Sequence, residues 1–141
     1  MLKGIPSILS PELLKVLMEM GHGDELVIAD GNFPAATIAQ RLVRSDGNMV
    51  PPLLEAILKF FPLDKYVPQP VALMALVPGE TYKPGIWETY RAICKKQEYF
   101  TDFESVERFA FYERAKKAYA VIATSETALY ANIILKKGVV I

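Results

Sequence analysis

The chain has 141 residues, of which 52% are hydrophobic and 23% are charged, and a chain of this length can bury a core of its own, so the sequence predicts one domain over residues 1–141. Sixteen basic and sixteen acidic side chains give a net charge of zero, which leaves no electrostatic footprint for nucleic acid and suits a self-associating protein. The single cysteine excludes an internal disulfide, and no apolar run reaches membrane length or resembles a signal peptide, so we expect a cytoplasmic protein that binds no membrane.

The first predicted element is a helix over 11–20. Ser10 can cap it, Pro11 occupies its first position and Gly21 can end it. Residues 26–29 are all apolar, which predicts a short strand covered on both faces. The chain then predicts a short helix over 34–43, a loop over 44–52 and a helix over 53–61.

The second half continues the alternation of strands and helices. Another fully apolar run predicts a buried strand over 71–77, followed by a helix over 86–97. Residues 106–118 are expected to begin as a strand or loop and to pass into a helix, and strands are expected over 119–126 and 132–140. This order is typical of a layered α/β domain.

His22 is the only histidine, and its type is the one whose unperturbed pKa lies near neutrality. Two interpretations stay open on the residues alone. His22 can be a cation that complements the end of the first helix, or it can be an acid/base group in a flexible turn between Gly21 and Gly23. Asp30 ends the first strand, where α/β sheets place their pockets, but an aspartate there can also cap a turn.

The last third of the chain gathers more polar candidates. Glu126, Tyr130 and Asn132 share a loop before a predicted strand, and Arg108 and Tyr112 lie in a segment rich in aromatic residues. Each has a structural alternative, as an ion-pair partner, a core aromatic or a turn residue. Trp87 is expected to pack, Cys94 to be a buried inert thiol, and Lys137 stays undecided between a structural and a binding role.

The sequence lacks the motifs of nucleotide-binding folds, zinc proteases, serine hydrolases and thioredoxins. One histidine cannot form a site with several histidine ligands, and the two DGN stretches lack the further ligand spacing of a calcium loop. We therefore expect no metal and no cofactor. What remains is acid/base chemistry without a metal, or binding.

Three stretches, GHGDELVIADGNFP, RFAFYERAKKA and YANIILKKGV, occur in the order and separation of the fucose mutarotase and ribose pyranase family. The chain resembles this family from end to end, and its middle stretch resembles the fucose branch. The resemblance implies a three-layer α/β/α sandwich with a mixed sheet. It also implies a ring-like homo-oligomer, typically a decamer, with pockets near the contacts between subunits.

The resemblance also implies roles for individual residues. The proton-donating histidine of the family falls on His22, and the sugar-binding positions fall on Asp30, Arg108, Tyr130, Ala131 and Asn132. Gly31 is a departure, because family members commonly have alanine after the aspartate; glycine there predicts a looser backbone beside the pocket.

The activity that the resemblance implies is the interconversion of the α and β anomers of L-fucose, without a cofactor, by acid/base opening of the ring. Two alternatives stay open: a ribose pyranase, which converts pyranose and furanose forms, and a sugar-binding protein without catalytic activity. The partner of His22 in the proton transfers also stays open, with Asp30 and Tyr130 as candidates.

Overall fold

A computed structural model describes residues 1–141 as one six-stranded sheet covered by five helices. None of the helices combines the length and the apolar character that crossing a bilayer requires. The elements, in chain order, are α1 (Pro11–Glu19), β1 (Glu25–Ala29), α2 (Ala35–Ile38), β2 (Leu42–Ser45), α3 (Val50–Leu58), β3 (Val71–Met74), α4 (Gly85–Cys94), β4 (Glu104–Val106), α5 (Arg108–Lys117), β5 (Ala120–Thr124) and β6 (Ile133–Lys136).

The strands lie in the order β2-β5-β1-β6-β3-β4, and only β6 runs against its neighbours. The mixed sheet predicted from the resemblance is therefore confirmed. Because five strands point the same way, their carboxyl ends meet at one edge of the sheet. The start of the reversed strand β6 lies at that same edge.

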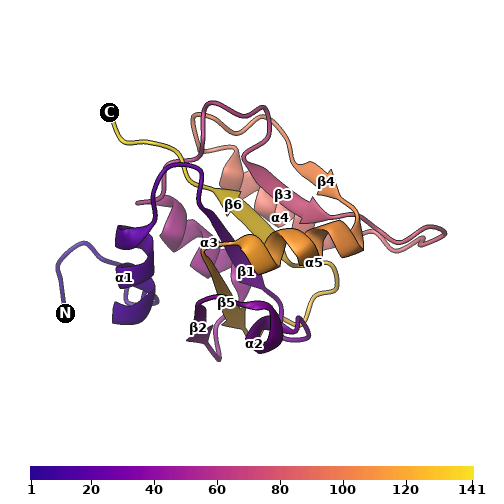
Figure 1. The fold of residues 1–141 in the computed structure, drawn as a ribbon, viewed down its shortest axis with the longest axis horizontal. Coiled ribbons are helices and arrows are strands. Elements are labelled where there is room, and N and C mark those ends of the chain that lie inside the picture. The colour runs from indigo at the N-terminus through magenta and orange to yellow at the C-terminus, as the bar shows by residue number, and fades with distance from the viewer.

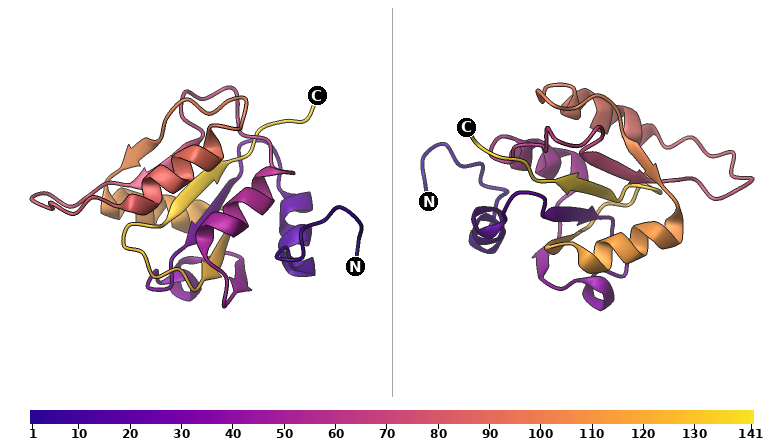
Figure 2. Two further views of the ribbon diagram at one scale, coloured as in Figure 1. Left: turned by 180° about the vertical axis from the view of Figure 1, so that it is seen from behind. Right: turned by 45° about the horizontal axis from the view of Figure 1, so that its top comes forward.

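The helices form a layer on each face of the sheet. Along β1, Leu26 and Ile28 pack into a core shared with α1, α3 and α4, whereas Val27 and Ala29 pack into a second core shared with α2 and α5. Figure 1 shows α5 in front of the sheet, and the left view of Figure 2 shows α3 and α4 on the opposite face. This arrangement is the predicted three-layer sandwich, and burial on both faces explains the uninterrupted apolar runs.

The first helix forms for the reasons that its sequence suggests. The hydroxyl of Ser10 accepts a hydrogen bond from the backbone N–H of Leu13 at 3.1 Å, and Pro11 takes the first helical position. The cap at the other end is Met20 rather than Gly21. This leaves the Gly21–Gly23 turn outside the helix.

Some predicted boundaries were wrong. The helix expected over 34–43 ends at Ile38, and Leu42–Ser45, predicted as helix and loop, form the edge strand β2. Only Val43 of β2 is buried, so neither an apolar run nor an alternating pattern marks this strand. The strand predicted over 132–140 is shorter in the structure, where β6 ends at Lys136.

Candidate active site

A cavity of about 330 Å³ lies at the edge where the parallel strands end. Residues that follow β1, β3 and β4 meet there with the loop that precedes β6, as the carboxyl ends of strands in α/β sheets commonly do around a ligand. Eleven residues line it: Asp30, Asn32, Phe33, Met74, Val77, Glu80, Arg108, Tyr112, Leu129, Tyr130 and Asn132. The structure thus brings together Asp30, Arg108, Tyr130 and Asn132.

Asp30 is a nearly buried carboxylate, 8% exposed, at the end of β1. Its Oδ1 accepts hydrogen bonds from the backbone N–H groups of Asn32 and Phe33, both at 2.9 Å, and its own N–H donates to Oδ1 of Asn132 at 2.7 Å. Burial raises the pKa of the Asp30 carboxyl above its ordinary value, and the negative charge of Glu126 adds to this, while the two N–H bonds and Asn132 oppose it.

The loop of Tyr130, Ala131 and Asn132 is held from behind by α4. Tyr130 is the only residue other than glycine with a positive φ, 57°, and Ala131 is completely buried. The indole Nε1–H of Trp87 donates to the Tyr130 carbonyl at 2.8 Å, and the Tyr90 hydroxyl donates to the Ala131 carbonyl at 2.7 Å. These two bonds fix an unusual backbone conformation and so set the direction of Asn132.

Arg108 is the first residue of α5 and lies exposed at the cavity. Its guanidinium forms no ion pair with a carboxylate within 4.0 Å, and its Cζ lies 5.0 Å from the ring centroid of Phe109. Its neighbour Glu107 caps α5 by accepting the N–H groups of Phe109 and Ala110, both at 3.0 Å, and these bonds lower the pKa of Glu107. The Arg108 side chain is therefore available to a ligand.

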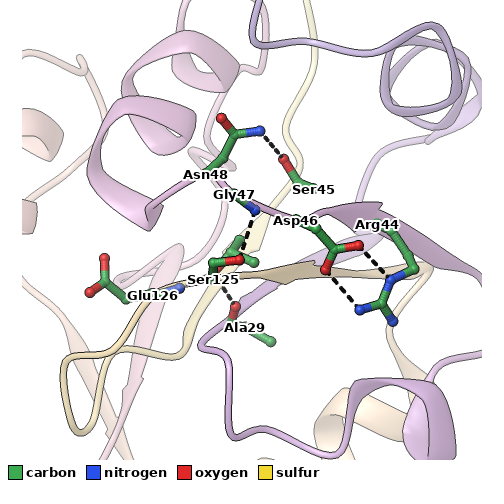
Figure 3. Close-up of polar contacts among 9 residues, drawn as sticks. Ala29, Arg44, Ser45, Asp46, Gly47, Asn48, Ser125 and Glu126 are labelled. Carbon is green, nitrogen blue, oxygen red and sulfur yellow. Dashed lines mark hydrogen bonds and ion pairs between the residues drawn. The ribbon is translucent and has the colours of Figure 1, made fainter.

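Glu126 has a structural role. Its Oε1 accepts the N–H groups of Thr127 and Ala128 at 3.0 Å, and its Oε2 accepts the N–H of Val50, the first residue of α3, at 3.2 Å. The preceding residue, Ser125, accepts the N–H of Gly47 at 2.7 Å (Figure 3), which ties the end of β5 to the turn after β2. This neighbourhood supports the cavity without lining it.

His22 lies at the opposite end of the strands, where the parallel strands begin. The N–H of Gly23 donates to the Lys137 carbonyl at 2.8 Å, beyond the end of β6, and the whole of β1 separates His22 from Asp30. The five residues of β1 alone span about 16 Å. His22 therefore does not reach the cavity of its own chain.

The His22 ring is accessible where it lies. Its side chain is 46% exposed, its Nε2 lies 3.1 Å from Oδ1 of Asp64, and its ring centroid lies 5.4 Å from that of Tyr66. The ring is not lodged in the packed interior. A carboxylate and an aromatic ring, both from the segment before β3, hold it at the surface.

Several cavity residues were not predicted from the sequence, namely Asn32, Phe33, Met74, Val77, Glu80 and Leu129. Val77 could have been found, because it ends the second apolar run, just as Asp30 directly follows the first. Cys94 is the buried thiol that was expected, and burial raises its pKa to about 12. Lys137 contributes a long contact of 3.4 Å from its Nζ to the Gly138 carbonyl, far from the cavity.

Comparison with known proteins decides the relationship. The model of the RbsD / FucU transport protein family matches residues 3–140. The chain belongs to the RbsD/FucU family. It is 53% identical to the human fucose mutarotase, with 98% of this chain and 94% of that protein covered, and 56% identical to the L-fucose mutarotase of Actinobacillus pleuropneumoniae, with 99% and 97% covered.

Solved structures of the RbsD/FucU family agree with the fold. The fucose mutarotase of Streptococcus pneumoniae, solved in complex with L-fucose, superimposes with a TM-score of 0.93 at 53% identity and covers 99% of this chain and 100% of its own. The resemblance noted from the three sequence stretches is thereby confirmed. The human, Actinobacillus and Streptococcus proteins all carry the name fucose mutarotase, as the middle stretch indicated.

Proposed function

We propose that this chain interconverts the α and β anomers of L-fucose by acid/base opening of the sugar ring, without a cofactor. The observation that carries the proposal is the cavity itself, whose lining combines the Asp30–Asn132 pair and the unpaired guanidinium of Arg108 with apolar side chains. Carboxylate, amide and guanidinium groups match the hydroxyls of a neutral sugar. The apolar lining residues, Phe33 and Met74 among them, suit the methyl group of a 6-deoxy sugar. High identity to named fucose mutarotases supports the same substrate.

The reaction needs two proton transfers and no change of oxidation state. A base removes the proton of the anomeric hydroxyl, the bond between C1 and the ring oxygen breaks, and an acid protonates the ring oxygen. The open aldehyde rotates about its C1–C2 bond, and the reverse transfers close the ring on the other face. Groups that take and give protons near neutral pH suffice, and each contributes typically 10²- to 10⁴-fold.

Asp30 and His22 are the two groups that we assign to these transfers. Because its pKa is raised, the Asp30 carboxyl holds a proton to higher pH than an exposed aspartate does, which suits an acid/base role. Tyr130, the other candidate for the second group, fits the role of a binding residue, since it lines the cavity on a loop that Trp87 holds in place. Arg108 and Asn132 orient the sugar hydroxyls.

His22 can reach a cavity only in an assembly, where the His22 of one chain lies at the cavity of a second copy. We assign the working form to a ring of copies in which the His22 edge of one chain meets the cavity edge of the next, as in the decamer that the resemblance implies. Large apolar side chains are exposed at both edges, with Tyr66 beside His22 and with Phe109 and Leu129 beside the cavity. Burial of such side chains stabilises an interface of this kind.

The lone buried Cys94 suits the reducing cytoplasm.

The test is saturation transfer between the anomeric proton signals of equilibrated L-fucose. Saturating the α H1 signal in the presence of the protein is expected to reduce the β H1 signal. His22→Ala and His22→Gln are expected to slow the transfer by about 10²- to 10⁴-fold, because the main proton carrier is lost, while the sugar still binds. Light scattering on each variant checks that the assembly is intact.

The same experiment separates the alternatives. Saturable binding by the unmodified protein without transfer between anomers would identify a binding protein and overturn the proposed activity. Faster exchange of D-ribose than of L-fucose would place the activity with the ribose branch. Full transfer by His22→Ala would remove His22 from the reaction while leaving the activity itself standing.

A further inference from the structure

Asp64 is a buried carboxylate that the sequence did not single out and that has no part in the proton transfers assigned to Asp30 and His22. It is 3% exposed and follows Leu63, which pairs with Lys137 at the end of β6. The N–H of Asp64 donates to the Lys136 carbonyl at 3.1 Å, and the N–H of Gly138 donates to the Pro62 carbonyl at 2.8 Å. A Cβ at Gly138 would lie 2.5 Å from the Leu63 carbonyl oxygen, so the two backbones touch. Asp64 is thus held firmly beside the sheet.

The carboxylate of Asp64 has one basic side chain within 4.0 Å, and it is His22. Oδ1 accepts the N–H of Tyr66 at 3.0 Å and lies 3.1 Å from His22 Nε2. A buried carboxylate is costly unless hydrogen bonds or an opposite charge compensate it. The imidazole provides that compensation, and the carboxylate in return fixes the imidazole.

We propose that Asp64 is a positioning residue for His22: its carboxylate accepts the Nε2–H, so the imidazole keeps that hydrogen on Nε2 and presents Nδ1 as the nitrogen that exchanges protons with the sugar. The inference rests on the proposed anomer interconversion. It names the reacting atom of His22 and the residue that selects it. Asp30, at the other edge of the sheet, cannot serve this purpose within the chain.

The local backbone explains why His22 needs such a partner. His22 stands between two glycines in an exposed turn, and Gly23 has a φ of 87°, so the backbone alone gives the ring little restraint. Tyr66 lies against one side of the imidazole, with 53° between the two ring planes. Asp64 holds the Nε2 side of the ring and Tyr66 lies beside it, while 46% of the His22 side chain stays exposed.

Asp64 could instead serve only the turn that leads to Tyr66, and substitutions separate the two roles. Asp64→Asn keeps an oxygen for the Tyr66 N–H but removes the charge that holds the imidazole, whereas Asp64→Leu removes both. We expect kcat for L-fucose exchange to fall about 10-fold in Asp64→Asn and about 100-fold in Asp64→Leu, with KM changed less than about 3-fold. Asp24→Asn is the matched control. It removes a carboxylate that accepts the Gly21 N–H at 2.8 Å in the same turn and is expected to leave kcat unchanged.

The single histidine gives an independent spectroscopic readout. In protein labelled with ¹⁵N-histidine, only His22 contributes imidazole signals. We expect a hydrogen on Nε2 that exchanges slowly with water in the unmodified protein and in Asp24→Asn, and fast exchange of that hydrogen in Asp64→Leu. Asp64→Asn is expected to show intermediate exchange.

The outcomes are distinct. Unchanged kcat in Asp64→Asn, or a neutral imidazole with its hydrogen on Nδ1 in the unmodified protein, would overturn the role of Asp64 while the proposed function stands. Absence of anomer exchange in the unmodified protein would overturn the proposed function first. If Asp64→Leu does not fold, the kinetics of Asp64→Asn and the signals of the unmodified protein still decide.

Discussion

Asp30 is a single buried charge whose proposed chemical role comes at the expense of stability. The carboxylate is 8% exposed and accepts hydrogen bonds from the backbone N–H groups of Asn32 and Phe33, neither of which carries a positive charge. Burial therefore disfavours its charged form and raises its pKa. A group whose pKa is higher in the folded chain than in the unfolded chain destabilises the fold at every pH above that folded pKa.

Asp30→Asn is expected to stabilise the protein and to inactivate it. Asparagine keeps an oxygen for the N–H groups of Asn32 and Phe33 but carries no charge. At pH 7 we expect a melting temperature about 2–4 °C above that of the unmodified protein. The cost to the unmodified protein is fully present above the folded pKa and disappears below the ordinary value of 3.8, so the difference should shrink as pH falls through that interval. Thermal melts at several pH values check this, and a variant that melts lower at pH 7 would contradict it.

The helix α4 shows how an element far from any reactive atom can shape a site. Burial, with the charges of Glu126 and Asp30, raises the pKa of the Tyr90 phenol well above its usual range, so Tyr90 remains a hydrogen-bond donor. Its target, the Ala131 carbonyl, is buried beside the strained backbone of Tyr130. The helix thus imposes on the loop a conformation that the loop would not adopt alone.

Tyr90→Phe removes this support with little change in volume. The Ala131 carbonyl loses its side-chain donor in a buried place, which costs about 1–3 kcal/mol of unfolding free energy. Because Asn132 then loses its fixed direction, KM for L-fucose is expected to rise more than kcat falls. Urea unfolding and exchange kinetics measure the two effects. Tyr119→Phe, which removes an exposed hydroxyl bond to Glu19, is the control and should change stability by less than about 0.5 kcal/mol.

The molecule as a whole places His22 and Asp30, the two groups that we propose for proton transfer, at opposite ends of the strands of one sheet. If two chains share each site, inactive chains can repair one another. In hybrids of His22→Gln and Asp30→Asn chains, a site is intact when His22 comes from one variant and Asp30 from the other. Random mixing makes about a quarter of the sites intact.

Co-expression of the two variants with different tags therefore should restore about a quarter of the exchange rate per site. Purification on both tags in succession isolates the hybrids, and saturation transfer measures the rate. Each variant co-expressed with itself remains inactive. Hybrids with no recovered activity would mean that each chain supplies its own His22 and Asp30, which would require a different structure of the chain.

The sequence predicted what depends on neighbours along the chain and missed what depends on distant contacts. β1 and β3 were predicted because burial on both faces leaves an unbroken apolar run, whereas β2 at the edge leaves none. Asp30 could be placed by its position after a strand, and Arg108 and Asn132 through the family resemblance. Asp64 could not be found, since 42 positions separate it from His22 and nothing nearby in the sequence marks the contact.

Strand β6 leads from Asn132 at one edge of the sheet to the turn beside His22 at the other. In a ring of copies, the length of β6 would set the distance between the cavity of one chain and the neighbouring cavity to which its His22 belongs. Its residues alternate between the two cores, so an inserted or deleted residue would turn Ile134 and its neighbours to the wrong face. Length variation in this architecture should therefore collect in the exposed loop over 78–83 and be absent from β6.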